Sequence, residues 1–248
     1  MTQPNPIAFT IGSLQVRWYG VLIAMGFLLA IIISYRKATK HNIDPDSVLD
    51  FAIFMIPLSI IGARLYYVVF SWDMYKNNPI SIFDIRSGGL AIHGGLLAGL
   101  ITALFFCKIK KIDFFNMGDL IFPQVALAQA IGRWGNFFNG EAHGGPTDLP
   151  WAIIVNGQSV HPTFLYESIW CLFLFFFLSH LDKKRSFTGQ IFMLYGMLYS
   201  VERFFVEGLR TDSLMIGPLR QAQVISAFIF LICLIIYIYR NKKQKGDI

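Results

Sequence analysis

The sequence predicts an all-α integral membrane protein, a bundle of about seven transmembrane helices with its N-terminus outside and its C-terminus in the cytoplasm. Of its 248 residues 55% are hydrophobic and only 15% are charged, whereas a soluble domain carries roughly 25% charged residues. The mean hydropathy is +0.54. Apolar runs of about 20 residues, the length that crosses a bilayer, are spread evenly, which favours a single transmembrane domain over residues 1–248.

Seven apolar runs are the expected helices. In order, they are Trp18–Tyr35, Val48–Phe70, Ser87–Cys107, Phe114–Gly132, Pro162–Leu181, Ser186–Val206 and Gln221–Tyr239. The first and last are uncharged, but the inner runs hold Arg64, Asp119, Glu167, Glu202 and Arg203. A charge inside a membrane is costly and by default indicates function.

Basic residues set the orientation, because cytoplasmic loops are enriched in Lys and Arg. Thirteen of the 21 follow the first, third, fifth and seventh runs: Arg36, Lys37, Lys40, Lys108, Lys110, Lys111, Lys183, Lys184, Arg185, Arg240, Lys242, Lys243 and Lys245. The opposite loops hold scattered ones such as Lys76, Arg86 and Arg220. The N-terminus lacks a basic region and a small-residue cleavage site, so no cleaved signal peptide is expected.

Composition and motifs exclude several classes of protein. The net charge of +6 lies in clusters between apolar runs, so it indicates membrane orientation, and we expect no nucleic-acid partner. Cys107, Cys171 and Cys233 lie in apolar runs without disulfide or metal spacing. Zinc, serine-triad and P-loop patterns are absent from the sequence, so we expect no metal and no cofactor. A nucleophile from the protein is not evident, which suggests that a substrate brings it.

A glycine-rich stretch, GRWGNFFNGEAHGG at 132–145, interrupts the apolar sequence. A charged, glycine-dense segment is excluded from lipid-exposed helix, so it either forms an interfacial loop or lines a polar cavity inside the protein. We expect an outward-facing loop over residues 132–160. Glycine leaves backbone N–H groups accessible, and the fork of donors on Arg133 suits phosphate. A lipid phosphate is the expected anion. The alternative is a connector with a snorkelling arginine.

A stripe of polar residues follows near the outer end of the sixth run. Tyr199, Arg203, Glu207 and Arg210 are spaced by 4, 4 and 3 residues, which places them on one helical face. Together with Arg133 they would put three guanidinium groups on the outer side, where orientation signals are not needed. The alternative is a structural salt bridge with interfacial snorkelling.

His93 is the best general base in the chain, because a histidine side chain ordinarily exchanges a proton near neutral pH. Glycines flank it at positions 88, 89, 94 and 95 and would let a second helix or a ligand approach closely. The alternative is a packing histidine.

Two further charges need partners. Glu167, in HPTFLYE, either serves a helix start or braces an arginine. Arg64 has no acidic residue nearby in its own run, so Asp119 or Glu167 are its candidate partners, and we favour a structural role for it.

The central stretch resembles the signature of bacterial prolipoprotein diacylglyceryl transferases. RWYG at 17–20, HGG at 93–95, HPTFLYES at 161–168 and RFFVEGLRTD at 203–212 match further segments of that family, in order and over nearly the whole chain. One departure is Phe164, where many members carry glutamine, which weakens a polar role for that position.

The resemblance implies a phosphatidylglycerol–prolipoprotein diacylglyceryl transferase with a single transmembrane catalytic domain. Such enzymes move the diacylglyceryl group of phosphatidylglycerol to the lipobox cysteine thiol of a preprolipoprotein signal peptide. A thioether forms and glycerol 1-phosphate leaves, as the first step of lipoprotein maturation. The implied partners are phosphatidylglycerol, the preprolipoprotein and membrane lipid, in a multi-pass protein of the bacterial cytoplasmic (inner) membrane.

The same resemblance implies catalytic roles for His93, Arg133, Arg203 and Glu207. The two arginines would stabilise charge on the leaving phosphate, and Glu207 would orient Arg203. His93 would take the thiol proton, directly or through the phosphate.

Residues implied to bind phosphatidylglycerol are Tyr19, Arg133, Asn136, Glu141, Gly144 and Arg203. Tyr19 and Asn136 would donate hydrogen bonds to the headgroup, and Glu141 would order the loop.

A transporter or flippase for a lipid or small anion is the alternative function, because buried arginines near broken helices serve such proteins too. The lack of an internal repeat argues against it. Purified protein incubated with phosphatidylglycerol and a lipobox peptide separates the two, since only the enzyme forms a thioether.

Overall fold

The computed structural model describes residues 2, 4–85 and 88–246. The chain forms two compact units, one comprising Met1–Ile33 and Gly118–Ile248 and the other Ser34–Met117. Arg86, expected among the scattered outer residues, and Ser87, expected to begin the third helix, lie outside the described residues.

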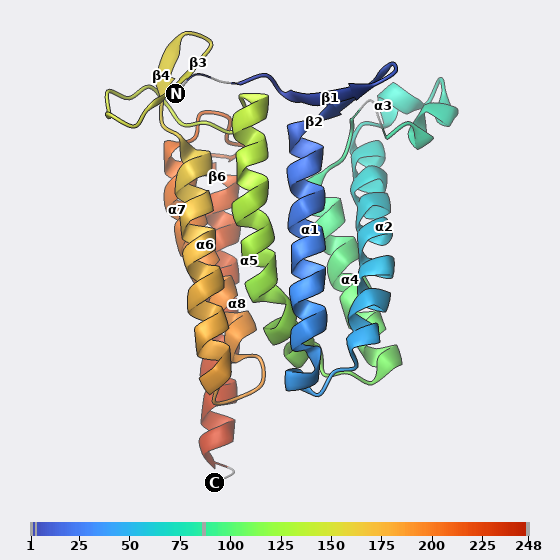
Figure 1. Cartoon of the computed structure of the whole chain (residues 1–248), viewed down its shortest axis with the longest axis vertical. Coiled ribbons are helices and arrows are strands. Elements are labelled where there is room, and N and C mark those ends of the chain that lie inside the picture. Colours follow the sequence, from blue (N-terminus) through green and yellow to red (C-terminus); the bar gives the residue numbers. More distant parts are fainter. Residues whose placement is uncertain (1, 3, 86–87, 247–248) are drawn as a thin grey trace. The chain divides into compact units, whose positions relative to one another are not determined.

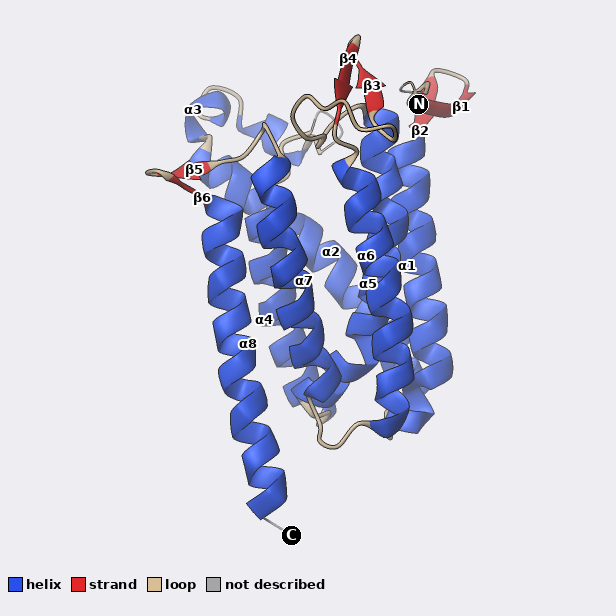
Figure 2. Cartoon of the chain, turned by 90° about the vertical axis from the view of Figure 1, so that its left-hand side faces the viewer, coloured by secondary structure: helices blue, strands red, loops and turns tan. Residues whose placement is uncertain are grey.

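The first unit contains most of α1 and α5 together with α6, α7 and α8, which run side by side in Figures 1 and 2. Its elements are β1 (Ile7–Ile11), β2 (Leu14–Arg17), α1 (Trp18–Lys37), α5 (Phe114–Asn139), β3 (Ile153–Val155), β4 (Gln158–Val160), α6 (Thr163–Leu181), η3 (Asp182–Lys184), α7 (Gln190–Leu209), β5 (Met215–Ile216), β6 (Leu219–Arg220) and α8 (Gln221–Gly246).

The second unit is built on a pair of packed helices, α2 and α4. Its elements are η1 (Ala38–His41), α2 (Pro45–Phe70), α3 (Trp72–Tyr75), η2 (Pro79–Phe83) and α4 (Ile92–Lys110). The start of α2 is encoded locally, because Pro45 occupies its first turn and the Asp44 side chain accepts a hydrogen bond from the Asp46 N–H at 3.2 Å.

Each of the seven predicted runs corresponds to a long helix among the described residues. The largest differences are at α8, which continues past Tyr239 to Gly246, and at α5, which continues past Gly132 to Asn139. The first part of the expected loop is therefore helical. The glycines serve packing there. A Cβ at Gly135 would lie 2.7 Å from Cδ2 of Tyr19, and one at Gly132 would lie 3.0 Å from Cδ1 of Ile23, so α1 approaches α5 at both positions.

Within the described residues, five helical stretches are long and apolar enough to cross a membrane: Trp18–His41, Pro45–Phe70, Ile92–Lys110, Thr163–Lys184 and Gln221–Gln244. The prediction of an α-helical, multi-pass integral membrane protein is confirmed. The other two long helices, α5 with 26 residues and α7 with 20, have a spanning length of about 30 Å or more but carry polar residues. The count of seven spans stays a prediction.

The part of the chain that the structure describes also contains three two-stranded antiparallel hairpins, β1–β2, β3–β4 and β5–β6, which were not predicted. Each turn holds a glycine with positive φ, namely Gly12 at 59°, Gly157 at 79° and Gly217 at 58°. Only glycine adopts this backbone conformation without steric cost. In the second turn, Asn156 and Gly157 form the Asn-Gly pair typical of tight hairpins.

Helices α2 and α4 meet at two glycines. A Cβ at Gly62 would lie 2.8 Å from the carbonyl oxygen of Gly94, and a Cβ at Gly94 would collide with the backbone of Gly62 and with Tyr66. Small residues of this kind let helix backbones approach closely in membranes. The prediction that glycines beside His93 admit a second helix is confirmed at Gly94.

The guanidinium of Arg64 donates five hydrogen bonds within its own unit, which leaves no donor for the predicted partners Asp119 or Glu167, so that prediction is wrong. Its buried guanidinium stacks 5.1 Å above the Tyr75 ring and donates to backbone carbonyls at 2.8–3.0 Å. The acceptors are those of Ser81, Ile82, Asp84, Gly88 and Gly89. Carbonyl oxygens of an irregular segment need donors when they are buried, and Arg64 supplies them.

Asp119 caps α7, a helix of its own unit. Its fully buried carboxylate pairs with Arg185 at 3.0 Å and accepts hydrogen bonds from the N–H groups of Gly189 and Phe192 at 2.6 and 2.9 Å. These N–H groups belong to the first turn of α7, where they lack partners within the helix. The carboxylate therefore fixes the beginning of α7 against α5.

Candidate active site

The first unit collects a group of buried charges from three neighbouring helices. We call it the arginine cluster: Arg133 from α5, Glu167 from α6, and Arg203, Glu207 and Arg210 from α7 and its C-cap. It lies toward the end of α5, near the beginning of α6 and toward the end of α7, ends that meet on one side of the unit in Figure 2.

Glu167 is the centre of the cluster. Its side chain is 1% exposed, and its two carboxylate oxygens face three arginines. Oε2 pairs with Nη2 of Arg133, and Oε1 lies 3.5 Å from Nη1 of Arg203 and 4.0 Å from Nη1 of Arg210. Three cations thus share one buried carboxylate, which favours the close approach of their guanidinium groups.

Arg133 and the α7 stripe are joined directly. Nη2 of Arg133 donates to the Tyr199 hydroxyl at 3.2 Å. One turn further along α7, Nη2 of Arg203 lies 2.7 Å from Oε2 of Glu207. The predicted helical face is therefore confirmed for Tyr199, Arg203 and Glu207, and the expected pairing of Glu207 with Arg203 is present. For Arg210 the prediction is wrong, because α7 ends at Leu209 and Arg210 is its C-cap in an extended conformation.

Arg210 closes the cluster at the C-cap of α7. It donates to both carboxylate oxygens of Asp212, at 2.9 and 2.8 Å, the fork geometry that arginine favours. This hydrogen bond lowers the pKa of the Asp212 carboxyl below its ordinary value. Asp212 therefore stays ionised at neutral pH and fixes one side of the Arg210 fork.

The rest of the glycine-rich stretch is anchored to α6 and α7. The Gly144 N–H donates to the carbonyl of His161 at 2.9 Å, and the Gly145 N–H to that of Leu209 at 2.9 Å. The Thr163 hydroxyl donates to the carbonyl of Ala142. A Cβ at Gly144 would lie 2.7 Å from Cβ of His161, so close packing of the segment requires glycine here.

Asn136 and Glu141 form a small polar group at the end of α5. Oε1 of Glu141 accepts hydrogen bonds from the side chains of Asn136 at 3.1 Å and Asn139 at 3.2 Å. Glu141 thereby orients the amide of Asn136. Tyr19, at the start of α1, packs against Gly135 next to Asn136 in sequence, so two residues implied to bind lipid lie on neighbouring helices.

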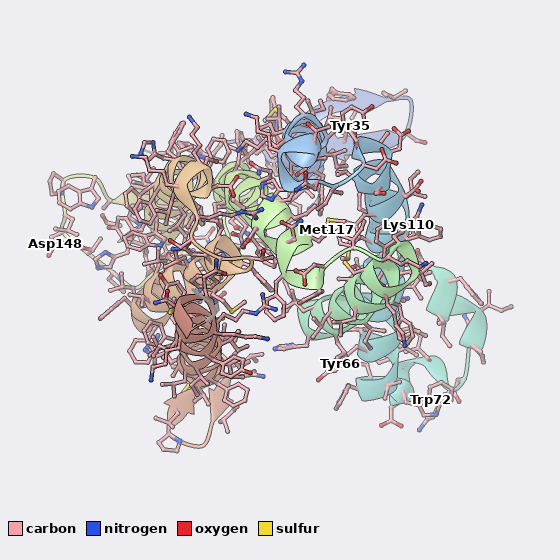
Figure 3. The ribbon with its side chains drawn as sticks, turned by 90° about the horizontal axis from the view of Figure 1, so that it is seen from below. Tyr35, Tyr66, Trp72, Lys110, Met117 and Asp148 are labelled. Atoms are coloured by element: carbon pink, nitrogen blue, oxygen red, sulfur yellow. The ribbon has the colours of Figure 1, made fainter. Side chains whose placement is uncertain are left out.

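His93 belongs to the second unit, in the first turn of α4. Its side chain is half-buried, and its ring centroid lies 6.1 Å from that of Tyr66 on α2. Tyr66 itself is drawn among the side chains of that unit in Figure 3.

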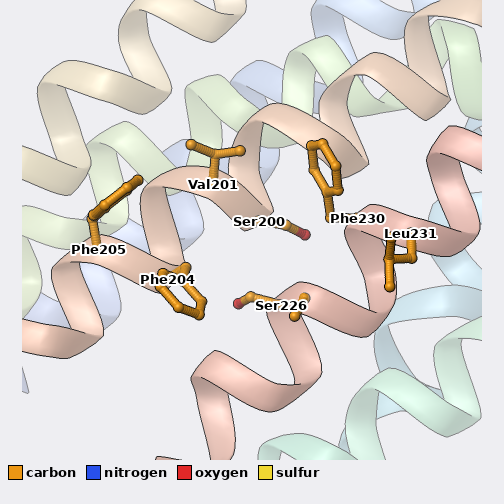
Figure 4. Close-up of a pocket in the computed structure, with 8 residues that line it drawn as sticks. Ser200, Val201, Phe204, Phe205, Ser226, Phe230 and Leu231 are labelled. Atoms are coloured by element: carbon orange, nitrogen blue, oxygen red, sulfur yellow. The ribbon is translucent and has the colours of Figure 1, made fainter.

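A separate pocket opens between α7 and α8 (Figure 4). Its volume is about 290 Å³. The lining residues are Ser200, Val201, Phe204, Phe205, Ser226, Ala227, Phe230 and Leu231. This lining is apolar apart from two serine hydroxyls, so it suits a hydrocarbon group better than a charged headgroup.

Sequence reasoning underestimated Glu167. Its position in HPTFLYE, close to a helix start, also fits an ordinary helix terminus. The sequence did contain a signal for this role. An acid inside an apolar helix requires a cation, and three arginines were predicted on the same side of the membrane.

The arrangement suits an anion. Guanidinium groups from two helices converge on one buried carboxylate, and Arg133 and Arg203 keep side chains that are 20% exposed. Groups so placed can donate to a second anion without a large rearrangement. Within the described ranges, the structure holds no set of three His, Cys, Asp or Glu side chains that could bind a metal ion.

Comparisons with known proteins show the family of the chain. Residues 6–239 match the model of the prolipoprotein diacylglyceryl transferase family. Proteins named phosphatidylglycerol–prolipoprotein diacylglyceryl transferase are similar over almost their full length. The one from Clostridioides difficile is 51% identical, with 98% of both chains covered. Those from Finegoldia magna and Clostridium novyi are 49% and 47% identical, with 97% and 98% of this chain and 98% of each relative covered. The chain therefore belongs to the prolipoprotein diacylglyceryl transferase family of enzymes.

Proposed function

We propose that this protein transfers the diacylglyceryl group of phosphatidylglycerol to the lipobox cysteine thiol of preprolipoproteins, the first step of lipoprotein maturation. The thiol sulfur attacks the glyceryl carbon that bears the phosphate, the C–O bond breaks, and glycerol 1-phosphate leaves. The observation that carries this proposal is the arginine cluster, a built anion site among the helices of a membrane protein. Similarity to enzymes of that name supports the choice of substrates.

Arg133 and Arg203 are the proposed phosphate ligands. Both are already held by buried carboxylates, so their donors are oriented before substrate arrives, and such preorganised donors stabilise charge that develops on a leaving group. Glu207 keeps Arg203 in place through its 2.7 Å ion pair. Tyr19 and Asn136 would bind the headgroup, with Glu141 and Gly144 shaping the segment beside them.

His93 is the proposed acceptor of the thiol proton, directly or through a phosphate oxygen. A free cysteine has a pKa of about 8.5, so little thiolate exists at neutral pH and a base speeds the attack. With the proton delivered to the leaving phosphate, the reaction balances without a cofactor.

We also propose seven spans, with the N-terminus outside and the C-terminus in the cytoplasm, in the bacterial inner membrane. In this arrangement α5 and α7 cross as well, and their polar residues face protein. The lipobox cysteine follows the core of a signal peptide, so the site belongs on the outer side. This orientation is supported by the basic residues, because most of them follow the first, third, fifth and seventh runs and would then lie in the cytoplasm.

The test is thioether formation from phosphatidylglycerol and a lipobox peptide, measured by mass spectrometry on purified wild-type protein and on Arg133→Lys. Lysine keeps the charge but loses the planar fork. We expect turnover to fall by a factor on the order of 10²–10³, the usual loss of one preorganised donor.

Arg185→Lys is the matched control. Arg185 is also paired with a buried carboxylate, and its side chain is 22% exposed against 20% for Arg133, but it lies at the opposite end of α7. This control should turn over like wild type. Unchanged turnover in Arg133→Lys would remove Arg133 from the mechanism, and absence of thioether product from wild type would refute the transferase.

A further inference from the structure

Glu202 is a buried acid on α7 that the proposed mechanism does not use. Its residue exposure is 7%, and neither of its carboxylate oxygens has a hydrogen-bond partner among the described residues. Glu167 and Glu207, by contrast, lie in ion pairs with arginines. A buried charge without hydrogen bonds is costly, and an acid avoids that cost by taking up a proton.

Charged and titratable groups surround Glu202 on three helices. Arg133 on α5 and Arg203 on its own helix attract a negative charge there. Glu167 on α6 repels it, and the thiol of Cys171 on α6 is also within electrostatic range. The charge of Glu202 is therefore felt by both proposed phosphate ligands.

The balance of charges decides which form of Glu202 is compatible with an anion. Arg133, Arg203 and Arg210 contribute three positive charges, and Arg220, which donates to the carbonyl of Arg210 at 2.8 Å, contributes a fourth. Glu167, Glu207 and Asp212 contribute three negative charges when ionised. The group therefore carries one positive charge if Glu202 is protonated and none if it is ionised. A phosphodiester adds one further negative charge, so an ionised Glu202 opposes its binding.

We propose that Glu202 is the proton-linked group of the anion site: it is protonated while the arginine cluster holds a phosphate, so headgroup binding takes up one proton from solvent. The O–H bond forms on a carboxylate oxygen, and the proton returns to solvent when the anion leaves. The identity of the anion as a lipid headgroup rests on the proposed function, but the proton linkage does not.

The measurable consequence is a pH-dependent affinity. Where Glu202 is ionised in the free protein, affinity for the anion should fall by up to about tenfold per pH unit as pH rises, because one proton must be taken up. Glutamine has the same shape and does not ionise. Glu202→Gln should therefore bind the anion with an affinity that changes little with pH and exceeds that of wild type at the alkaline end.

The experiment uses the full chain in phosphatidylcholine nanodiscs, titrated with short-chain phosphatidylglycerol between pH 6 and pH 9. Calorimetry in two buffers with different heats of protonation counts the protons taken up. Wild type should take up a proton over part of this range, and Glu202→Gln should take up none. Asp73→Asn, which removes an exposed acid with a 91% exposed side chain in the second unit, should behave like wild type.

Equal proton uptake by wild type and Glu202→Gln would overturn the inference, as would absence of uptake by wild type at every pH. Glu202→Asp keeps a titratable carboxyl and should keep the proton uptake. This variant therefore distinguishes loss of the titratable group from a packing defect caused by substitution at position 202. Thioether formation by the same preparations is scored separately. Wild type that shows linked binding but forms no thioether refutes the transferase and leaves the proton linkage intact.

Discussion

At the scale of single residues, the molecule depends on where buried charges find partners. Arg64 is satisfied by backbone carbonyl oxygens, whereas Arg133, Arg203 and Arg210 share the carboxylate of Glu167. Both solutions avoid an unpaired buried cation, but they differ in what they offer. Carbonyl acceptors saturate the guanidinium, while a shared carboxylate leaves donors for another anion.

Glu167→Gln should destabilise the first unit strongly. The substitution keeps the shape and removes the charge that faces all three arginines in the cluster, and breaking a buried ion pair typically costs about 3–5 kcal/mol. We expect a lower unfolding temperature in detergent and loss of most turnover. Glu207→Gln is the comparison, because the ion pair of Glu207 is with Arg203 at 2.7 Å and its loss should cost less. A Glu167→Gln protein as stable as Glu207→Gln would contradict the central role of Glu167.

At the scale of elements, two devices fix the helices: glycine contacts and a carboxylate cap. The α2–α4 pair meets at Gly62 and Gly94, and α1 meets α5 at Gly132 and Gly135. Asp119 ties the beginning of α7 to α5. The glycine contacts fix how closely each pair of helices approaches, and the Asp119 cap fixes where α7 begins beside α5.

Gly94→Ala should separate α2 from α4. The new methyl group would meet the backbone of Gly62, which cannot rotate away, and overpacking of this kind costs about 1–3 kcal/mol. Gly20→Ala is the control, since a Cβ added there in α1 would meet no atom within 4 Å, and alanine is favoured over glycine in a helix by up to about 1 kcal/mol. Thermal unfolding should rank Gly94→Ala below wild type and Gly20→Ala at or above it. The same stability for both variants would argue against a glycine contact.

Hydropathy predicted the seven long helices among the described residues, because a long apolar run can be recognised without knowing which segments lie beside it. It misplaced the end of α5: Gly132 and Gly135 signal a loop in isolation, but Tyr19 and Ile23 from α1 turn the same glycines into packing sites. The β3–β4 hairpin was missed although Asn156 and Gly157 form a recognisable turn signal.

In the candidate site, too, features local to one helix were predictable and contacts between distant segments were not. The spacing of Tyr199, Arg203 and Glu207 is local to one helix, so it was predictable. The choice of Glu167 as the shared partner, and of carbonyl oxygens for Arg64, depends on contacts between segments far apart in sequence. No periodicity carries that information.

At the scale of the whole molecule, the proposed topology is testable by cysteine labelling. Asp148 lies on a loop that projects beyond the helices of its own unit (Figure 3). The native residues Cys107, Cys171 and Cys233 are buried, so the wild-type protein should give little background labelling. An impermeant maleimide added to intact cells should label Asp148→Cys, and should label Lys243→Cys only after the cells are opened. The reverse pattern would contradict seven spans with an outer N-terminus.

The order of the charges along the chain has a consequence for biosynthesis. Arg133 is made first, then Glu167, then Arg203 and Arg210, and the last two enter with α7, one of the two long helices that fall short of the apolar requirement for crossing a membrane alone. Because the shared carboxylate is synthesised before the later arginines, they emerge beside a counter-charge that already exists. In a seven-span protein, α7 would then be stabilised during insertion by its contact with α6 rather than by lipid, so release of α6 and α7 from the insertion machinery should be coupled.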